Sequence, residues 1–591
     1  MPTLSKVIDP MPTPTTKSYS HTVALDGRND LKLYKNLARM LFALETRFRI
    51  SDIHTTAADA VTDGGDDKKC DMVYIDRDTG EVVIAQSYHS QKERKEVSAN
   101  KACDLNTAVT WLLSAPLAKI PKQIRSSASE LRSALSDNEV RSFQIWFVHN
   151  MDESKNVDKE LPQVEHSATA LLDQHFEHSE LEEIVAVQVG RETLEEWYTA
   201  LETPILVSDE FQIDVDDAYE IEDNEWSSAV TSVPASWLYD AYKKFGSKLF
   251  SANVRDYLGS RRSTKNVNHN IKGTVDKTPG KFWVYNNGIT ALVHEFEVGD
   301  GQISIHGLSI VNGAQTTGAI GSLTKRPSSE ARVQARFVKC TDIQTVKEII
   351  QYNNTQNAVK VTDFRSNDPI QRRLRQEFDA IPNASYVGGR RGGEEDKIRR
   401  SPNAIPTDSC SQAIASFHQE PNVAYHRKSE VWENDKFYSR YFNEETNASH
   451  VLMAFSLLRG IELHKRSLMQ KDQRTDIESE QLEFLRNRGA TFLLTAAIAN
   501  CIEVFLGHAV PNKFRIGFGN ASLPTAIQYW EPIIHATIPF APQLAEATGP
   551  GLKTKPKIDQ AIRTFRQLVD ATKAANATVY STFAGIVVVR D

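Results

Sequence analysis

Two short apolar runs near the front of the 591-residue chain are accompanied by residues with side-chain oxygens. Such residues can hold the metal ion that hydrolyses a phosphodiester. Asp71 stands directly before the run MVYID, and Gln86 lies near the end of the run EVVIAQSY. The tetrapeptide RDTG between them suits a tight turn, so the two runs predict a β-hairpin. A residue at the start of one hairpin strand meets a residue at the end of the other. Asp71 and Gln86 could therefore share one Mg²⁺ ion, which prefers oxygen ligands.

The segment GGDDKKCD followed by VVIAQSY resembles the PD-(D/E)xK nuclease motif in its D…Q-x-K form. The resemblance implies that Asp71 is the first metal ligand and that Gln86 occupies the second, acidic position. Tyr88 departs from the pattern, because the motif has lysine there and tyrosine supplies no positive charge. Either the site is inactive or another lysine replaces the missing one, with Lys101 as the first candidate and Lys92 as the second. An edge hairpin whose Asp and Gln side chains face water is the alternative.

The residues around the hairpin favour an α/β domain. Apolar residues recur at helical spacing from Leu31 to Leu44, and Glu45 follows this stripe by one position, so that it could assist catalysis from a first helix. Two further β-type runs, FQIWFVHN and IVAVQV, alternate with helical patterns. This order predicts an α/β unit over residues 26–205, preceded by a flexible arm over residues 1–25.

Two later runs each contain an Asn-Gly element, FWVYNNGITALV from Phe282 and LSIVNGAQTTGAI from Leu308. We expect two strands that each end in a tight turn, because Asn and Gly tolerate positive φ angles. Amides, hydroxyls and a strand-to-helix turn suit a phosphate group or a base edge. Turns without any ligand are the alternative.

Together with the segments NVRDYLG, NVNHNIKGT and YNNTQNAVKVTDFRSNDPIQRRL, these runs resemble the abortive-infection phage-resistance family, abbreviated AIPR. The resemblance covers residues 237–442 and implies a role in bacterial defence against phage. Members of the family commonly carry a PD-(D/E)xK-type domain ahead of this core. We assign Asn287, Asn312, Gln315 and Asn354 to a nucleic-acid surface, although the resemblance does not define the ligand that they contact.

Two basic stretches could follow a phosphate backbone. Seven Lys and Arg residues against two Asp lie between Arg255 and Lys281. The Gly-flanked segment GGRRGGEEDKIRR forms the second stretch. The candidate contacts in the two stretches are Arg255, Arg261, Arg262, Lys265, Arg390 and Arg391. Solvated surface is the alternative interpretation of both.

Composition excludes several other classes of protein. The net charge is −8, so any nucleic-acid contact must be made by local patches. The five cysteines form no C-x-x-C pair, which argues against zinc and for a reducing cytoplasm. The most apolar run, FLLTAAIANCIEVFLG, is too short and too polar to span a bilayer and predicts a buried helix.

The sequence thus predicts an α/β multi-domain protein. A restriction-endonuclease-like domain is followed by a central α+β AIPR core over residues 206–445 and a mainly helical domain over residues 446–591. The acidic stretch 207–225 is expected to form an exposed connector or rim near the first boundary.

The expected function is Mg²⁺-dependent endonuclease cleavage of DNA, or of RNA, by a cytoplasmic anti-phage protein without a membrane partner. The alternative is an inactive nucleic-acid-binding or nucleotide-sensing component. A second copy of the chain or other defence proteins are further expected partners.

Overall fold

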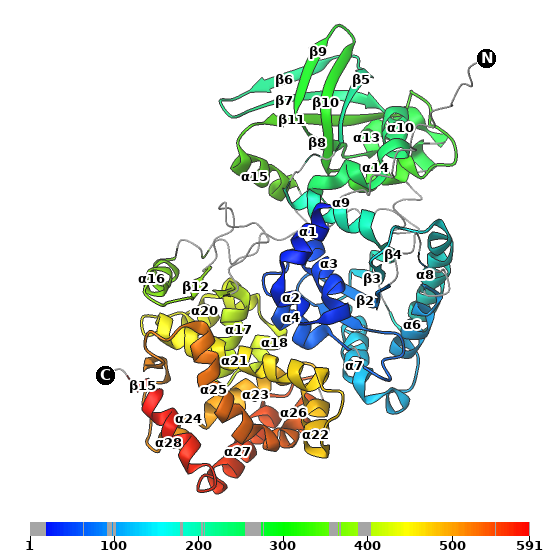
Figure 1. Cartoon of the computed structure of the whole chain (residues 1–591). Helices are drawn as coiled ribbons and strands as arrows, with labels where there is room; N and C mark the ends of the chain where they lie inside the picture. The colour runs from blue at the N-terminus through cyan, green and yellow to red at the C-terminus, as the bar shows by residue number, and fades with distance from the viewer. Residues whose placement is uncertain are drawn as a thin grey trace, which may run out of the picture.

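The structure, a computed structural model, contains three units (Figure 1). It describes residues 19–62, 64–91, 97, 102–177, 181–202, 205, 207–253, 273–275, 277–353, 365, 368–387, 403–549 and 551–589. We call residues 19–202 the N-terminal unit, residues 207–353 the middle unit and residues 365–589 the C-terminal unit. Helices dominate the last of these, so the mixed α/β, multi-domain fold class and the helical C-terminal region are confirmed.

The N-terminal unit is built on a four-stranded sheet in the order β1-β2-β3-β4. Its strands are β1 (Met72–Asp76), β2 (Glu81–Tyr88), β3 (Ser142–His149) and β4 (Glu183–Val189). Strands β1 and β2 form an antiparallel hairpin with Met72 opposite Ala85, and β2, β3 and β4 run parallel. The bounds of β1 and β2 coincide with the two apolar runs of the sequence. Strand β1 is an edge strand of the sheet.

Helices cover both faces of this sheet, because its strands carry apolar residues on both sides. Val82 and Ile84 face a cluster formed with α6 (Leu105–Leu113), α7 (Lys122–Ser136) and α8 (Lys155–His175). Val83 and Ala85 face the opposite cluster, formed with α3 (Ala38–Phe48), α4 (Ile53–Ala60) and α9 (Arg191–Glu202). The unit also contains α1 (Ser20–Gly27), α2 (Asn29–Lys32), η1 (Lys35–Leu37) and η2 (Leu117–Lys119).

The stripe from Leu31 to Leu44 does not form one helix. It is divided among α2, η1 and α3, and the break lies at Lys35, whose φ angle is +53°. This left-handed conformation is incompatible with a continuous right-handed helix. Leu31, Leu37, Leu41 and Leu44 are nevertheless all buried in the same cluster. Periodicity therefore identified the buried residues correctly but not the break.

One buried carboxylate lies at the start of β4. The Glu183 residue is 7% exposed, and its Oε2 accepts a hydrogen bond from Ser142 Oγ at 3.0 Å. Its Oε1 is buried and has no hydrogen-bond partner among the described residues. Burial first, and the Glu81 carboxylate second, raise the pKa of Glu183 to about 8. Glu183 is therefore protonated in the folded protein at neutral pH.

Glu183→Gln is expected to stabilise the protein by roughly 2 kcal/mol at pH 8 and to have little effect at pH 4.5. Because the raised pKa lets the folded state keep a proton that the unfolded state loses above about pH 4.5, wild-type stability falls as the pH rises toward 8. Urea unfolding at both pH values measures the difference. The exposed neighbour Glu182 supplies the control substitution Glu182→Gln. An equal effect of Glu183→Gln at both pH values would contradict the buried, protonated state.

The middle unit contains a seven-stranded sheet in which β5-β10-β8-β11-β7-β6 are neighbours and β9 pairs with β10. Its strands are β5 (Val207–Asp214), β6 (Ala218–Glu222), β7 (Trp226–Pro234), β8 (Ile289–Val293), β9 (Glu295–Gly299), β10 (Gln302–Asn312) and β11 (Arg332–Cys340). Its helices are α10 (Ala235–Phe245), η3 (Gly246–Asn253), η4 (Pro279–Lys281), α13 (Phe282–Tyr285), α14 (Ala314–Gly321) and α15 (Ile343–Asn353). The acidic stretch 207–225 forms β5 and β6 at the two ends of the strand order, so it is a rim made of strands rather than a connector.

The C-terminal unit packs its helices around the largest apolar cluster of the protein. Its helices are α16 (Pro369–Phe378), α17 (Thr407–Phe417), α18 (Pro421–His426), α19 (Glu430–Glu433), α20 (Asp435–Tyr441), α21 (Ala448–Gln470), α22 (Asp476–Leu485), α23 (Ala490–Asn500), α24 (Ile502–Leu506), η7 (Lys513–Arg515), α25 (Leu523–Thr537), η8 (Ile538–Leu544), α26 (Ala545–Thr548), α27 (Lys555–Ala571) and α28 (Ala577–Ile586). Short strand pairs join β12 (Ser385–Tyr386) to β13 (Ala404–Ile405) and β14 (Ile516–Gly517) to β15 (Val588–Val589). Nearly all of α23 is buried, as predicted. Within the described part of the chain, no helix has the length and apolar character needed to cross a membrane.

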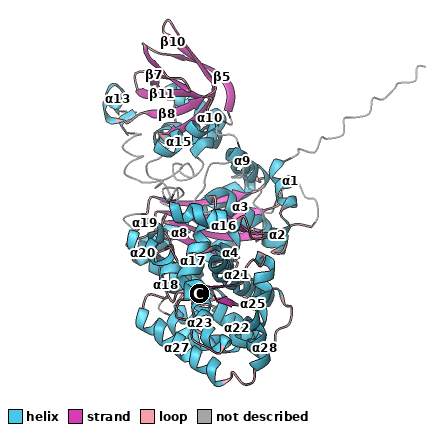
Figure 2. Ribbon diagram, turned by 90° about the vertical axis from the view of Figure 1, so that its left-hand side faces the viewer, coloured by secondary structure: helices cyan, strands magenta, loops and turns pink. Residues whose placement is uncertain are grey.

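The N-terminal unit lies between the other two units (Figures 1 and 2). On one side α9 contacts η3 of the middle unit, and on the other side α4 contacts α21 of the C-terminal unit. The second contact contains a buried ion pair, in which Arg459 Nη2 lies 2.5 Å from Asp52 Oδ2. Arg459 Nη1 also lies 2.8 Å from Glu462 Oε2. Segments that are some 400 residues apart in the sequence thus share one charged, buried contact.

Candidate functional site

The first candidate site lies where the β1–β2 hairpin opens away from its turn. Asp71 precedes β1 and stands one register step beyond the Met72–Ala85 pair, which places it across from Gln86. The Asp71 N–H donates to Ala85 O at 2.9 Å, and Asp71 Oδ2 accepts from the Ser87 N–H at 2.6 Å. The structure therefore brings the two residues of the nuclease-like motif together on neighbouring strands.

Gln86 carries a buried side-chain amide. The residue is 8% exposed, and its Oε1 has no hydrogen-bond partner among the described residues. Side chains alternate along β2, so Gln86 lies on the face of Val82 and Ile84, the face covered by α6, α7 and α8. A buried oxygen without a donor is costly, and a cation or a donor at this position would satisfy it.

Of the other residues considered for this site, the structure describes Tyr88 and Glu45. Tyr88 ends β2 opposite His149 and packs partly against the cluster that contains Ile84. Glu45 lies on α3, over the opposite face of the sheet, and its Oε2 accepts from Arg28 Nη1 at 2.5 Å. Lys92 and Lys101, the candidates for the missing lysine, lie outside the described residues.

The donor atoms at this site suit a hard divalent cation. The Asp71 carboxylate and the Gln86 amide oxygen are oxygen ligands, and Mg²⁺ is commonly held by one or two protein oxygens with waters and substrate phosphates completing its shell. Among the described residues, no group of three or more His, Cys, Asp or Glu side chains could hold a metal ion. In the described part of the chain, the candidate metal ligands of this site are therefore Asp71 and Gln86.

The second candidate site joins the two Asn-Gly elements of the middle unit. Gly288 and Gly313 have φ angles of +80° and +90°, and a Cβ atom on Gly313 would lie 2.7 Å from Gly288 O. A Cβ on Gly288 would lie 2.5 Å from Gln334 O. Only glycine fits both positions, so the turns pack directly against each other. The Asn286 side chain links them to α14 by donating to Thr316 Oγ1 at 2.9 Å.

Three of the candidate amides gather around these turns. Asn287, Asn312 and Gln315 are all exposed, and Asn312 Nδ2 donates to Asn353 O at 2.8 Å. We call these three residues the amide surface. The other candidates for nucleic-acid contact, namely Arg255, Arg261, Arg262, Lys265, Asn354, Arg390 and Arg391, lie outside the described residues.

The part of the chain that holds the amide surface matches a known protein family. Residues 250–504 match the family model described as AIPR protein. This match supports the AIPR family, in agreement with the motifs of the sequence. No curated protein and no solved structure gave a significant match. The β1–β2 hairpin lies outside the matched residues, so its likeness to nucleases stays a prediction.

The AIPR-matching residues include an exposed aromatic patch that the sequence did not reveal. Phe282–Tyr285 forms helix α13 rather than the expected strand, and only Phe282 points into the core. Trp283, Val284 and Tyr285 are 41%, 72% and 66% exposed. A four-residue apolar run does not distinguish strand from helix, and alternation cannot then show which rings are exposed. The patch directly precedes the Asn-Gly turn of the amide surface.

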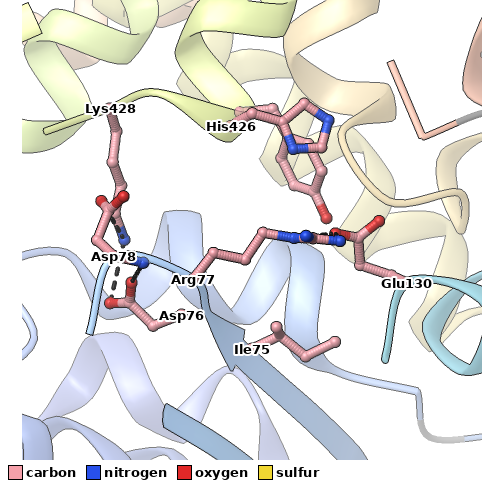
Figure 3. A pocket seen from close by; sticks show the side chains of 8 residues that line it. Ile75, Asp76, Arg77, Asp78, Glu130, His426 and Lys428 are labelled. Carbon is pink, nitrogen blue, oxygen red and sulfur yellow. Dashed lines mark hydrogen bonds and ion pairs between the residues drawn. The ribbon is translucent and has the colours of Figure 1, made fainter. Parts of the chain in front are cut away.

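A cavity lies at the other end of the hairpin, where its turn meets AIPR-matching residues of the C-terminal unit (Figure 3). Arg77 Nε donates to Glu130 Oε1 at 2.8 Å, and Lys428 Nζ lies 3.1 Å from Asp76 Oδ2. Burial favours a lower pKa for Lys428, but the Asp76 and Asp78 carboxylates outweigh it and hold this pKa above its ordinary value. At about 40 Å³ the cavity is too small for a nucleotide. It is a charged contact between the two units.

Proposed function

We propose that this protein is a metal-dependent nuclease with a role in defence against phage. The AIPR match supports the defence role. The observation that supports nuclease chemistry is the buried Gln86 Oε1, which lies opposite Asp71 and has no hydrogen-bond partner in the described part of the chain. The surrounding mixed sheet, with helices on both faces, is the setting in which the nuclease motif is expected.

In this proposal Asp71 and Gln86 hold Mg²⁺ against a phosphate of DNA or RNA. The bound cation would lower the pKa of a water nucleophile and stabilise the negative charge that develops on the phosphate. The Ser87 N–H orients the Asp71 carboxylate through their 2.6 Å hydrogen bond. Lys101 or Lys92 would stabilise the developing charge in place of the lysine that Tyr88 replaces. Glu45 has no role in this proposal, because it lies over the opposite face of the sheet and pairs with Arg28.

A cleavage assay tests the proposal. Purified protein is incubated with double-stranded DNA, single-stranded DNA and RNA, with Mg²⁺ and with EDTA in parallel. The expected result is cleavage of at least one substrate that EDTA abolishes. Absence of cleavage under all conditions would favour a second function, recognition of nucleic acid without catalysis.

The observation that favours this second function is the aromatic patch beside the amide surface. Exposed rings stack on unpaired bases, and amides bind base edges or phosphates. Lys277 and Lys281 are exposed nearby, and residues 277–294 contain no Asp or Glu, so the local charge suits a polyanion. Single-stranded nucleic acid is the ligand that this combination fits.

Trp283→Ala is expected to weaken binding of a single-stranded oligonucleotide by about 1–3 kcal/mol, or roughly 5- to 150-fold, since it removes one stacking ring. Fluorescence anisotropy of a labelled oligonucleotide measures the dissociation constant. Tyr219→Ala is the matched control, because Tyr219 is 68% exposed on the acidic strand β6. Equal affinities of the wild type and Trp283→Ala would remove the aromatic patch from the binding surface.

A further inference from the structure

The outer side of strand β1 is held by a residue of the C-terminal unit. Because β1 is an edge strand, the carbonyls on its free side need partners from outside the sheet. Arg488 Nη1 donates to Val73 O at 2.9 Å. Val73 is the second residue after Asp71, so this contact lies two residues along the chain from the candidate metal ligand.

The same guanidinium fixes the end of α4. Arg488 Nη1 donates to Asp59 O at 3.0 Å, and its Nε lies 3.1 Å from Asp59 Oδ2 and 3.2 Å from Tyr425 Oη. The backbone around Arg488 is held too, since its N–H donates to Ser126 Oγ at 2.9 Å and the Gly489 N–H donates to Asp59 Oδ1 at 3.0 Å. Arg488 is 4% exposed. It therefore forms a rigid link between α4, β1 and the C-terminal unit.

The end of α4 leads directly to the backbone of Asp71. Val61 forms a bridge with Met72, and the Thr62 N–H donates to Asp71 O at 2.9 Å. Thr62 Oγ1 also donates to Cys70 O at 2.6 Å. Val61 and Thr62, which follow α4, thus hold the outer side of the backbone at Asp71 and Met72. Arg488 binds Asp59 before this contact and Val73 after it, so it ties α4 to β1.

We propose that Arg488 is a positioning residue that sets the place of Asp71 through β1 and α4, so that the candidate nuclease site depends on the C-terminal unit. This inference rests on the proposed nuclease function for its effect on cleavage, but not for its effect on the hairpin itself. Lysine cannot replace Arg488, because one ammonium group cannot reach two carbonyls, a carboxylate and a hydroxyl in the geometry of a guanidinium.

Arg488→Lys in the full chain tests the proposal by amide hydrogen exchange. The Ser87 N–H, which is protected by Asp71 Oδ2, is expected to exchange at least about tenfold faster in the variant. The Mg²⁺ concentration for half-maximal cleavage is expected to rise by about 10- to 100-fold, as for other residues that orient a metal ligand. The dissociation constant for an oligonucleotide in EDTA is expected to stay unchanged.

Two further variants separate positioning from general stability. Arg459→Lys perturbs another buried contact between the same units, with Asp52 at the start of α4, and should leave Ser87 exchange as in the wild type. Tyr425→Phe removes one partner of Arg488 without changing shape, and it serves if Arg488→Lys does not fold. Tyr425→Phe is expected to accelerate Ser87 exchange to a smaller degree.

The outcomes distinguish this inference from the proposed function. Wild-type protein that cleaves nothing would end the nuclease proposal, while faster Ser87 exchange in Arg488→Lys would still support positioning of the hairpin. Unchanged Ser87 exchange in folded Arg488→Lys, or in Tyr425→Phe, would overturn the inference even if the wild type cleaves. Equal acceleration in Arg459→Lys would also overturn it, since the effect would then reflect loosening of the whole interface.

Discussion

Asp71→Asn is expected to lower metal-dependent cleavage by about 10³-fold without changing the fold. Asparagine has nearly the same shape, and its side-chain oxygen can still accept the hydrogen bond from the Ser87 N–H. It lacks the negative charge, however, and a neutral amide binds Mg²⁺ much more weakly than a carboxylate does. Initial cleavage rates across a range of Mg²⁺ concentrations measure the loss.

Asp66→Asn is the matched control for this substitution. Asp66 is a carboxylate of the loop before β1, 58% exposed at its side chain and paired with Lys68 Nζ at 2.5 Å. Its neutralisation is expected to leave the cleavage rate within about twofold of the wild type, because exposed ion pairs contribute little. Circular dichroism and thermal unfolding verify that both variants fold. A folded Asp71→Asn variant that cleaves as fast as the wild type would place the active site elsewhere in the chain.

Arg459→Met is expected to destabilise the protein by about 3–5 kcal/mol. The Arg459 and Asp52 side chains are only 12% and 5% exposed, and their charged atoms lie 2.5 Å apart. Burial favours a higher pKa for Asp52, but Arg459, His54 and Ser409 together outweigh it and hold this pKa well below its ordinary value. Without the guanidinium, Asp52 would keep an uncompensated charge in a buried interface. Urea unfolding followed by circular dichroism measures the change.

Lys122→Met is the control at the same interface. Lys122 Nζ lies 2.8 Å from Glu483 Oε2, but the two side chains are 65% and 50% exposed. Water screens this pair, so its loss is expected to cost under about 1 kcal/mol. Similar losses for Arg459→Met and Lys122→Met would show that burial of the Arg459–Asp52 pair does not set its energetic effect.

The sequence predicted correctly those strands and helices whose local apolar patterns are strong. The alternating and continuous apolar runs gave the strands that became β1 to β4, and turn residues marked the bend between β1 and β2. The buried helix α23 was expected from its apolar run alone. Short or interrupted runs were less reliable: FWVY became helix α13, and the stripe from Leu31 was broken at Lys35. In both cases a local apolar pattern was compatible with more than one backbone conformation.

The sequence by itself determined which chemical groups are available and which residues next to them form strands and helices. It thereby placed Asp71 opposite Gln86, since a two-strand hairpin is a local structure whose register follows from its turn. Only the tertiary structure decided that the two Asn-Gly turns contact each other, and that Arg488 and Arg459 reach the N-terminal unit from more than 400 residues away. Such contacts leave no periodic pattern in the sequence, because a buried arginine becomes defined only when distant segments supply its carbonyl and carboxylate partners.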